Sequence, residues 1–156
     1  MSKYNLAQIN IAKVLAPMDD PIMKGFEDNL DAIYRISDVH PDFLCRINNE
    51  DYPTELRDAF PDESLIVNIS VWKDLISLFD FTYKSGHVEI FKRKKEWLSK
   101  IQMKYMGCWY FQEGNVPAYQ EPKQRLNYVN KNGYTPYAFS FKDKFSIADS
   151  LIYKPL

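Results

Sequence analysis

The sequence is poor in the residues that build metal sites. Its 156 residues include only two cysteines and two histidines. Neither cysteine belongs to a CxxC motif or to a Cys/His cluster, so a structural zinc site is not expected. Cys45 and Cys108 both fall in strand-like segments, and we expect them to be buried thiols, which fits a reducing cytoplasm.

Long apolar runs and an excess of one charge are also absent. No run approaches the ~20 apolar residues of a bilayer-spanning helix. The N-terminal stretch lacks the apolar core and cleavage site of a secretory signal. Twenty basic against 21 acidic side chains leave a net charge of −1, which gives no global attraction to nucleic acid or to an anionic membrane. We expect a cytoplasmic protein that binds neither.

Apolar and aromatic residues, in contrast, are plentiful. They make up 46% and 15% of the chain, which is ample for one packed domain. The composition changes after Gly114, where a short helix at 123–130, a stop at Gly133 and an extended "AFSFKDKF" follow. We therefore divide the chain into a domain at 1–113 and a C-terminal extension at 114–156 packed on that domain.

Alternation and helical spacing predict the elements of residues 1–113. Strands are expected at 6–13, 43–47, 64–72 and 104–111. A helix is expected after Asp19 or Asp20, with Pro21 in its first turn, and it ends before His40-Pro41. A second, long helix is expected at about 73–100. The acidic segment between 48 and 64 reads as a loop.

The resulting order, β-α-β-β-α-β, predicts an α+β fold of the ferredoxin-like type with an antiparallel sheet. Both helices would then cover one face of the sheet and leave the other face bare. A second copy of the same sheet is the simplest cover for that face. We therefore expect a homodimer.

His87 lies in the middle of the second predicted helix. With three- and four-residue spacing it shares a face with Ile76, Phe79, Tyr83, Ile90 and Lys94. Ser85-Gly86 directly before it weakens the helix and predicts a kink. Two interpretations stay open. His87 is either a core residue hydrogen-bonded to a neighbour, or a proton-transfer group or ligand at a pocket.

The basic run at 92–95 allows two interpretations. Cations near a helix C-terminus stabilise the helix dipole and are commonly solvated. Alternatively, Arg93 or Lys94 captures an anion such as a substrate carboxylate.

Two strands carry polar side chains at matching positions. Gln8, Asn10, Asn68 and Ser70 share one parity of neighbouring strands, and Arg46 is a candidate to join them. Buried amides must be hydrogen-bonded, so the row forms either a structural network at a dimer interface or the lining of a pocket. Which face of the sheet it occupies stays open. Trp72, Trp97 and Trp109 could wall a cavity or simply fill the core.

The stretches "LAQINIAKVLAPMDDPIMKGFEDNLDAI", "LIVNISVW", "YKSGHVEIFKRKKEWL" and "TPYAFSF" resemble a family of small bacterial proteins of unknown function. That family belongs to the dimeric α+β barrel superfamily, which includes the antibiotic-biosynthesis monooxygenases. The resemblance implies a homodimer with sheets face to face. It also implies relatives that are cofactor-free monooxygenases, isomerases, lactone-forming enzymes or haem enzymes with a helix histidine on the iron. The long acidic insertion after Ile47 departs from the pattern and would reshape a pocket mouth.

Together these observations favour a cofactor-free enzyme that oxygenates, isomerises or cyclises an aromatic or polyketide-like substrate. His87 would be the general base, and Asn10, Asn68 or Trp72 would stabilise the oxyanion. The expected substrate contacts are Phe79, Tyr83, Phe91, Arg93, Lys94, Trp97 and Trp109. Two alternatives remain: a haem protein with His87 as axial ligand and Arg93 and Lys94 at the propionates, or a non-catalytic metabolite-binding dimer.

Overall fold

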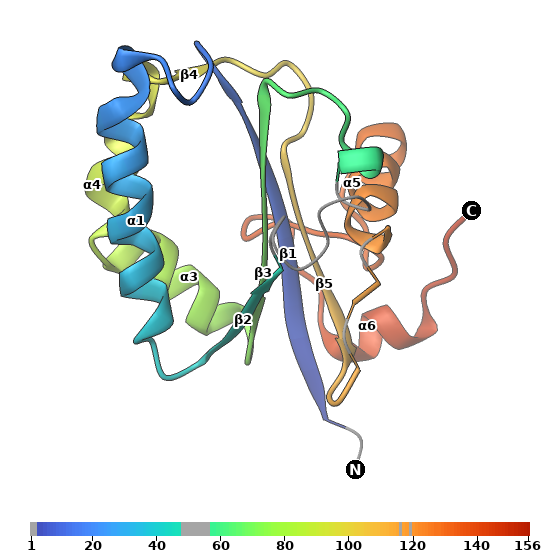
Figure 1. The fold of residues 1–156 in the computed structure, drawn as a ribbon. Coiled ribbons are helices and arrows are strands. Elements are labelled where there is room, and N and C mark those ends of the chain that lie inside the picture. The colour runs from blue at the N-terminus through green and yellow to red at the C-terminus, as the bar shows by residue number, and fades with distance from the viewer. Residues whose placement is uncertain (1–2, 48–56, 116, 119) are drawn as a thin grey trace.

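The computed structural model describes residues 3–47, 57–115, 117–118 and 120–156. They form an antiparallel sheet with helices on both faces (Figure 1). The central strand β1 (Tyr4–Val14) pairs with β3 (Leu65–Trp72) on one side, and with β5 (Met106–Gln112) and the short β4 (Leu98–Ser99) on the other. Strand β2 (Phe43–Ile47) pairs with β3 at the edge. The predicted α+β fold with an antiparallel sheet is confirmed.

One face of the sheet carries the three helices α1 (Lys24–Asp38), α3 (Leu75–Lys84) and α4 (His87–Lys92) (Figure 1). They follow the strands in the order that the sequence predicts. In the part of the chain that the structure describes, no helix has the length and apolar character to cross a membrane.

Helix α1 begins as the sequence indicates. Asp20 accepts a hydrogen bond from the backbone N–H of Ile22 at 3.0 Å, and Pro21 opens a 3-10 turn, Pro21–Met23, that leads into α1. A side-chain acceptor satisfies one of the orphan N–H groups of a helix start, and proline has no N–H to leave orphaned there. The helix ends at Asp38, before His40-Pro41.

The prediction of a single helix at 73–100 is wrong. The chain instead forms α3, a break at Ser85-Gly86, α4, a 3-10 turn (Lys94–Glu96) and then β4. Ser85 has an extended backbone, and its hydroxyl donates to the Phe81 carbonyl. A Cβ on Gly86 would lie 3.0 Å from Cδ1 of Ile36 in α1. The predicted kink is thus a full break, at a point where α1 approaches the backbone closely.

The face of α3 that packs on the sheet also differs from the expected one. Ile76 is 72% exposed, and Phe79 and Tyr83 are also exposed. Leu78 and Phe81 are buried instead, in one cluster with Trp72. The helix carries two apolar stripes, and the stripe with Leu78 and Phe81 packs against the large indole of Trp72. The spacing of the apolar residues alone could not rank the two stripes.

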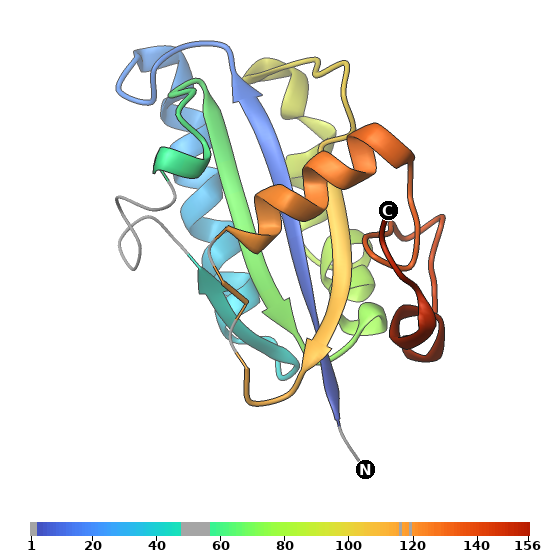
Figure 2. The same ribbon diagram turned by 90° about the vertical axis from the view of Figure 1, so that its right-hand side faces the viewer.

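The second face of the sheet is not bare. Helix α5 (Glu121–Asn132) from the C-terminal extension lies across it (Figure 2). Leu126 packs there into a cluster with the strand residues Ala7, Ile9, Ile11, Ile47, Ile69 and Trp109. A partner copy is therefore not needed to bury this face. The homodimer itself stays a prediction.

The helix expected at 123–130 and its stop are confirmed. Helix α5 ends before Gly133, which has a φ of 80° that favours glycine. The chain then reaches the edge of the sheet, where Phe139 and Cys108 exchange backbone hydrogen bonds of 2.8 and 2.9 Å. Beyond it, Phe141 packs on the ring of Phe79 in α3, and α6 (Ile147–Ile152) follows. The extension thus contacts the helices of the opposite layer.

Two smaller expectations concern strand β2 and the segment after it. Cys108 is buried as expected, but Cys45, in the edge strand β2, is exposed. Residues 48–56, most of the acidic insertion, lie outside the described residues. Residues 57–59 form a helical turn instead of the expected loop. Lys123 of α5 donates to the Ala59 carbonyl, so this turn is attached to α5.

Candidate functional site

The polar row of the strands faces helices α1, α3 and α4. Leu6 and Trp72, which share its parity, pack with Leu78 and Phe81 of α3. Because successive side chains of a strand point to opposite faces, Gln8 and Ser70 lie on this side as well. This arrangement resolves the question that the sequence left open. The row lies between the helices and the sheet and not under α5.

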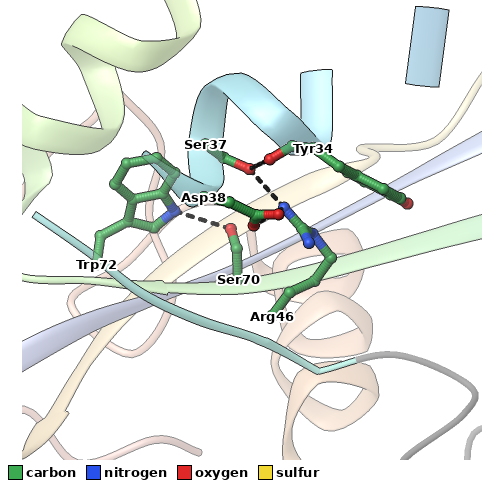
Figure 3. Close-up of polar contacts among 6 residues, drawn as sticks. All are labelled: Tyr34, Ser37, Asp38, Arg46, Ser70 and Trp72. Atoms are coloured by element: carbon green, nitrogen blue, oxygen red, sulfur yellow. Dashed lines mark hydrogen bonds and ion pairs between the residues drawn. The ribbon is translucent and has the colours of Figure 1, made fainter. Parts of the chain in front are cut away.

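The row is a continuous hydrogen-bonded network. The Gln8 amide Nε2 donates to Ser70 Oγ at 2.9 Å and to Asn10 Oδ1 at 3.2 Å. Asn68 Nδ2 donates to the same Asn10 oxygen at 2.9 Å. Trp72 Nε1 donates to Ser70 Oγ at 2.9 Å (Figure 3). Each residue of the row therefore holds a neighbour in place, as a buried polar network requires.

The two ends of the row differ in how many of their hydrogen-bond donors are already used. Both hydrogens of the Gln8 amide and the Trp72 indole N–H are used within the network. No hydrogen bond between described residues uses the Asn10 amide hydrogens or the second hydrogen of Asn68 Nδ2. Gln8 and Ser70 are buried, whereas Asn10 and Asn68 are half-buried. The asparagine end therefore has donors left for a ligand.

Arg46 of β2 joins the row, opposite Ser70 in the register. Its guanidinium lies 3.9 Å from the centre of the Tyr34 ring (Figure 3). Its Nη2 donates to Ser37 Oγ and, at 3.3 Å, to Asp38 Oδ1. Only 16% of the side chain is exposed. The sequence made Arg46 only a candidate for the row. Its side depends on an irregularity of the strand register between Phe43 and Cys45, and the positions of Tyr34 and Ser37 follow only from the packing of α1.

Tyr34 keeps its phenol proton near this cation. Burial raises the pKa of the Tyr34 hydroxyl, although the positive charge of Arg46 acts in the opposite direction. The hydroxyl is therefore neutral at physiological pH and remains a hydrogen-bond donor. No carboxylate belongs to the row, and the partner of Arg46, Asp38, is 54% exposed.

His87 lies at the start of α4, directly after the break. Its Nδ1 is 3.1 Å from the Thr82 carbonyl oxygen. Since a carbonyl only accepts, Nδ1 carries the proton and Nε2 has a free lone pair. The ring is 5.3 Å from Phe81 and 6.2 Å from Phe91, between ring centres. Phe81 in turn lies 4.9 Å from Trp72, so Phe81 is the link between His87 and the row.

We predict that His87 titrates at a lower pH than an ordinary histidine. Burial lowers the pKa of the imidazole below its usual 6.5, and the hydrogen bond to Thr82 opposes this shift. The unfolded chain then binds the proton more readily, so this contribution to stability is present above pH 6.5 and is lost as the pH falls through the folded-state pKa. NMR titration of the imidazole Cε1–H measures it, with His87→Gln to assign the signal. A His87 pKa at or above 6.5 would contradict this environment.

The expected substrate contacts are not all brought together. Phe79 and Tyr83 form a surface cluster with Phe141 on the outer side of α3. Trp97 is buried with Phe26 and Met23 in a separate apolar cluster. Trp109 is buried on the opposite face of the sheet, under α5.

Of the expected substrate contacts, Phe91 forms a ring pair with His87, with 6.2 Å between ring centres. Lys94 lies 4.3 Å from the centre of the Phe91 ring, whereas Arg93 is paired with Glu96 at 2.6 Å and stacks on Trp97. The residues expected around a haem are therefore dispersed, and those present do not fit that group. Within the described ranges, no three His, Cys, Asp or Glu side chains are grouped to hold a metal ion.

Comparison with known proteins places the chain in a family. A family model described as "Domain of unknown function (DUF3291)" matches residues 5–153. Among solved structures, the chain is similar to PA3566 from Pseudomonas aeruginosa, with 17% identity, a TM-score of 0.45, and 74% of this chain and 97% of that chain covered. It is also similar to NE2512, a protein of unknown function from Nitrosomonas europaea, with 10% identity, a TM-score of 0.46, and 74% and 96% covered. No curated protein matches the chain.

Proposed function

Since the chain belongs to the family of the domain of unknown function DUF3291, we propose its activity from the chemistry of the site. We infer a cofactor-free enzyme in which His87 is the general base toward an aromatic or polyketide-like substrate. The resemblance to a family of unknown function is confirmed. The relation of that family to the antibiotic-biosynthesis monooxygenases stays a prediction.

The observation that carries this proposal is the hydrogen bond of the His87 ring to Thr82. A backbone carbonyl at 3.1 Å from Nδ1 selects one tautomer and orients the ring. Nε2 is then the basic atom, and no hydrogen bond between described residues occupies it. Because burial lowers the pKa of His87, the imidazole is neutral and able to accept a proton at physiological pH.

In the proposed reaction His87 Nε2 takes a proton from an activated C–H or O–H group and leaves a carbanion or phenolate. Isomerisation or cyclisation returns the proton at another atom. In oxygenation a CH₂ group reacts with O₂, one oxygen atom enters the product as a carbonyl, and the other leaves as water. The side chains support both outcomes equally, because each needs only the base and an anion stabiliser.

Asn10 and Asn68 are the proposed stabilisers of the oxyanion. Both retain amide hydrogens outside the network, whereas the Trp72 indole N–H is already bound to Ser70 at 2.9 Å. We therefore assign Trp72 to positioning Ser70 and not to the oxyanion. Phe81 separates His87 from Trp72. A substrate that reaches both His87 and the asparagines must therefore be extended, which fits a planar polycyclic molecule.

The experiment is a screen of hydroxylated aromatic and polyketide-like compounds for O₂ uptake and for product formation without O₂. In His87→Ala, turnover of any hit should fall at least ~100-fold, as expected for the loss of a general base. His40→Gln is the matched control and should keep the turnover: the His40 ring packs on the edge of Trp72, 5.3 Å between ring centres, but His40 belongs neither to the polar row nor to the surroundings of the base. An unchanged rate in His87→Ala would remove this residue from the mechanism.

An absorption spectrum with a hemin titration tests the competing function. We expect no Soret band that depends on His87. A sharp band in wild type that is missing in His87→Ala would replace the acid–base proposal with haem ligation. Binding of metabolites with no turnover in any condition would favour a non-catalytic metabolite-binding protein.

A further inference from the structure

Arg46 is a cation held at low exposure beside a row that contains no carboxylate. Its guanidinium is stacked 3.9 Å from the centre of the Tyr34 ring and 5.2 Å from that of Phe43. Stacking on aromatic rings fixes the plane of the guanidinium, so little side-chain freedom remains to be lost when it binds a ligand. Such a pre-oriented cation suits the recognition of an anion.

Its hydrogen-bond partners among the described residues occupy one of its nitrogens. Both hydrogen bonds, to Ser37 Oγ and to Asp38 Oδ1, come from Nη2. Within the described residues no hydrogen bond uses Nε or Nη1, which together carry three hydrogens. The pair with Asp38 is long, at 3.3 Å, and Asp38 is more exposed than buried. An ion pair of that kind is weak in water and leaves the cation available.

Apart from Asp38, the described residues of the row beside Arg46 add hydrogen-bond donors but no carboxylate. Register pairs Arg46 with Ser70, and Ser70 with Gln8. Asn68 is two residues from Ser70 on the same strand, which is roughly 7 Å along β3. Asn10 and Asn68 have amide hydrogens that no described residue accepts. A ligand on the row would therefore meet one fixed positive charge and several hydrogen-bond donors.

From this juxtaposition we propose that the polar row binds an aromatic carboxylate and that Arg46 selects it over the uncharged analogue. The inference rests on the proposed function only in taking this row as the ligand site. The carboxylate accepts from Arg46, while the aromatic body lies on the side of Phe81. Arg46 is thus a specificity residue, separate from the base.

The test compares two matched pairs of probes by isothermal titration and NMR. They are salicylate against salicylamide, and 1-hydroxy-2-naphthoate against 1-hydroxy-2-naphthamide. The wild-type protein should bind each carboxylate with at least ~10-fold higher affinity than the matching amide, as expected for a charge-assisted hydrogen bond. Arg46→Met should lose this preference, and Arg46→Lys should keep only part of it.

Arg35→Met on α1 is the matched control, because Arg35 is exposed and its removal changes the net charge by the same amount. It should leave the preference intact. A purely structural role for Arg46 would lower stability in Arg46→Met without changing the ratio of the two affinities. No preference in wild type, or an unchanged preference in Arg46→Met or Arg46→Lys, would overturn the inference. His87→Ala should keep the preference for the carboxylate. A failure of the proposal that His87 is the base can therefore be distinguished from a failure of this inference about Arg46.

Discussion

Leu126→Asp is expected to destabilise the whole protein, although Leu126 lies in the C-terminal extension. Leu126 is 3% exposed and packs on the sheet with Ile9, Ile69 and Trp109. Replacing a buried leucine by a small residue costs about 2–5 kcal/mol, and a carboxylate in the same place adds a desolvation cost. We therefore expect the free energy of unfolding to fall by more than about 3 kcal/mol.

Urea denaturation followed by tryptophan fluorescence measures this loss. Gln124→Asp is the matched control, because Gln124 is exposed on the same helix and should cost less than about 1 kcal/mol. If the two variants were equally stable, α5 would not be a structural cover of the sheet. The face would then be open to the partner copy that the sequence led us to expect.

Trp72→Ala is the second change with a large expected effect. Trp72 is 1% exposed, and its ring packs on Phe43 and Phe81 at 5.1 and 4.9 Å between ring centres. Removing a buried tryptophan side chain costs about 3–5 kcal/mol. The indole N–H also holds Ser70, so its loss removes one of the bonds that order the polar row.

Trp72→Phe separates these two contributions. It retains an aromatic ring but removes the donor to Ser70 Oγ, which we expect to cost about 1 kcal/mol for the hydrogen bond and somewhat more for the reduced volume. Thermal and urea unfolding of both variants give the comparison. A cost below about 1 kcal/mol for Trp72→Ala would contradict the packing described here.

The local parts of the fold were predictable because they depend on neighbouring residues. The strand "LIVNISVW" alternates apolar and polar residues from Val67 to Val71, and Asp20-Pro21 carries the start signal of α1. Gly133 stops α5 through its left-handed backbone conformation. In each case the preference is encoded within a few residues of the element, so no distant contact is needed to recognise it.

The candidate site was only partly predictable, because it depends on residues that are distant in the chain. The matching parity of Gln8, Asn10, Asn68 and Ser70 indicated that they share a face of the sheet. Which face it is depends on where Trp72 packs. Likewise, the spacing of Phe79 and Tyr83 with His87 suggested one helix face, but the break at Ser85-Gly86 separates them. Such a break ends the periodic relation between the residues on its two sides.

The sequence by itself determined the antiparallel α+β fold, the positions of β1, β2, β3 and β5 to within a few residues, a weak point of the helix near Gly86 and the pairing of polar residues on β1 and β3. The tertiary structure alone decided that the polar row faces α1 and α3, that Arg46 stacks on Tyr34, and that α5 covers the other face. The physical reason is range. Alternation, capping and turns act between neighbours in the chain, whereas the choice between two apolar faces depends on which distant side chains fill the same space.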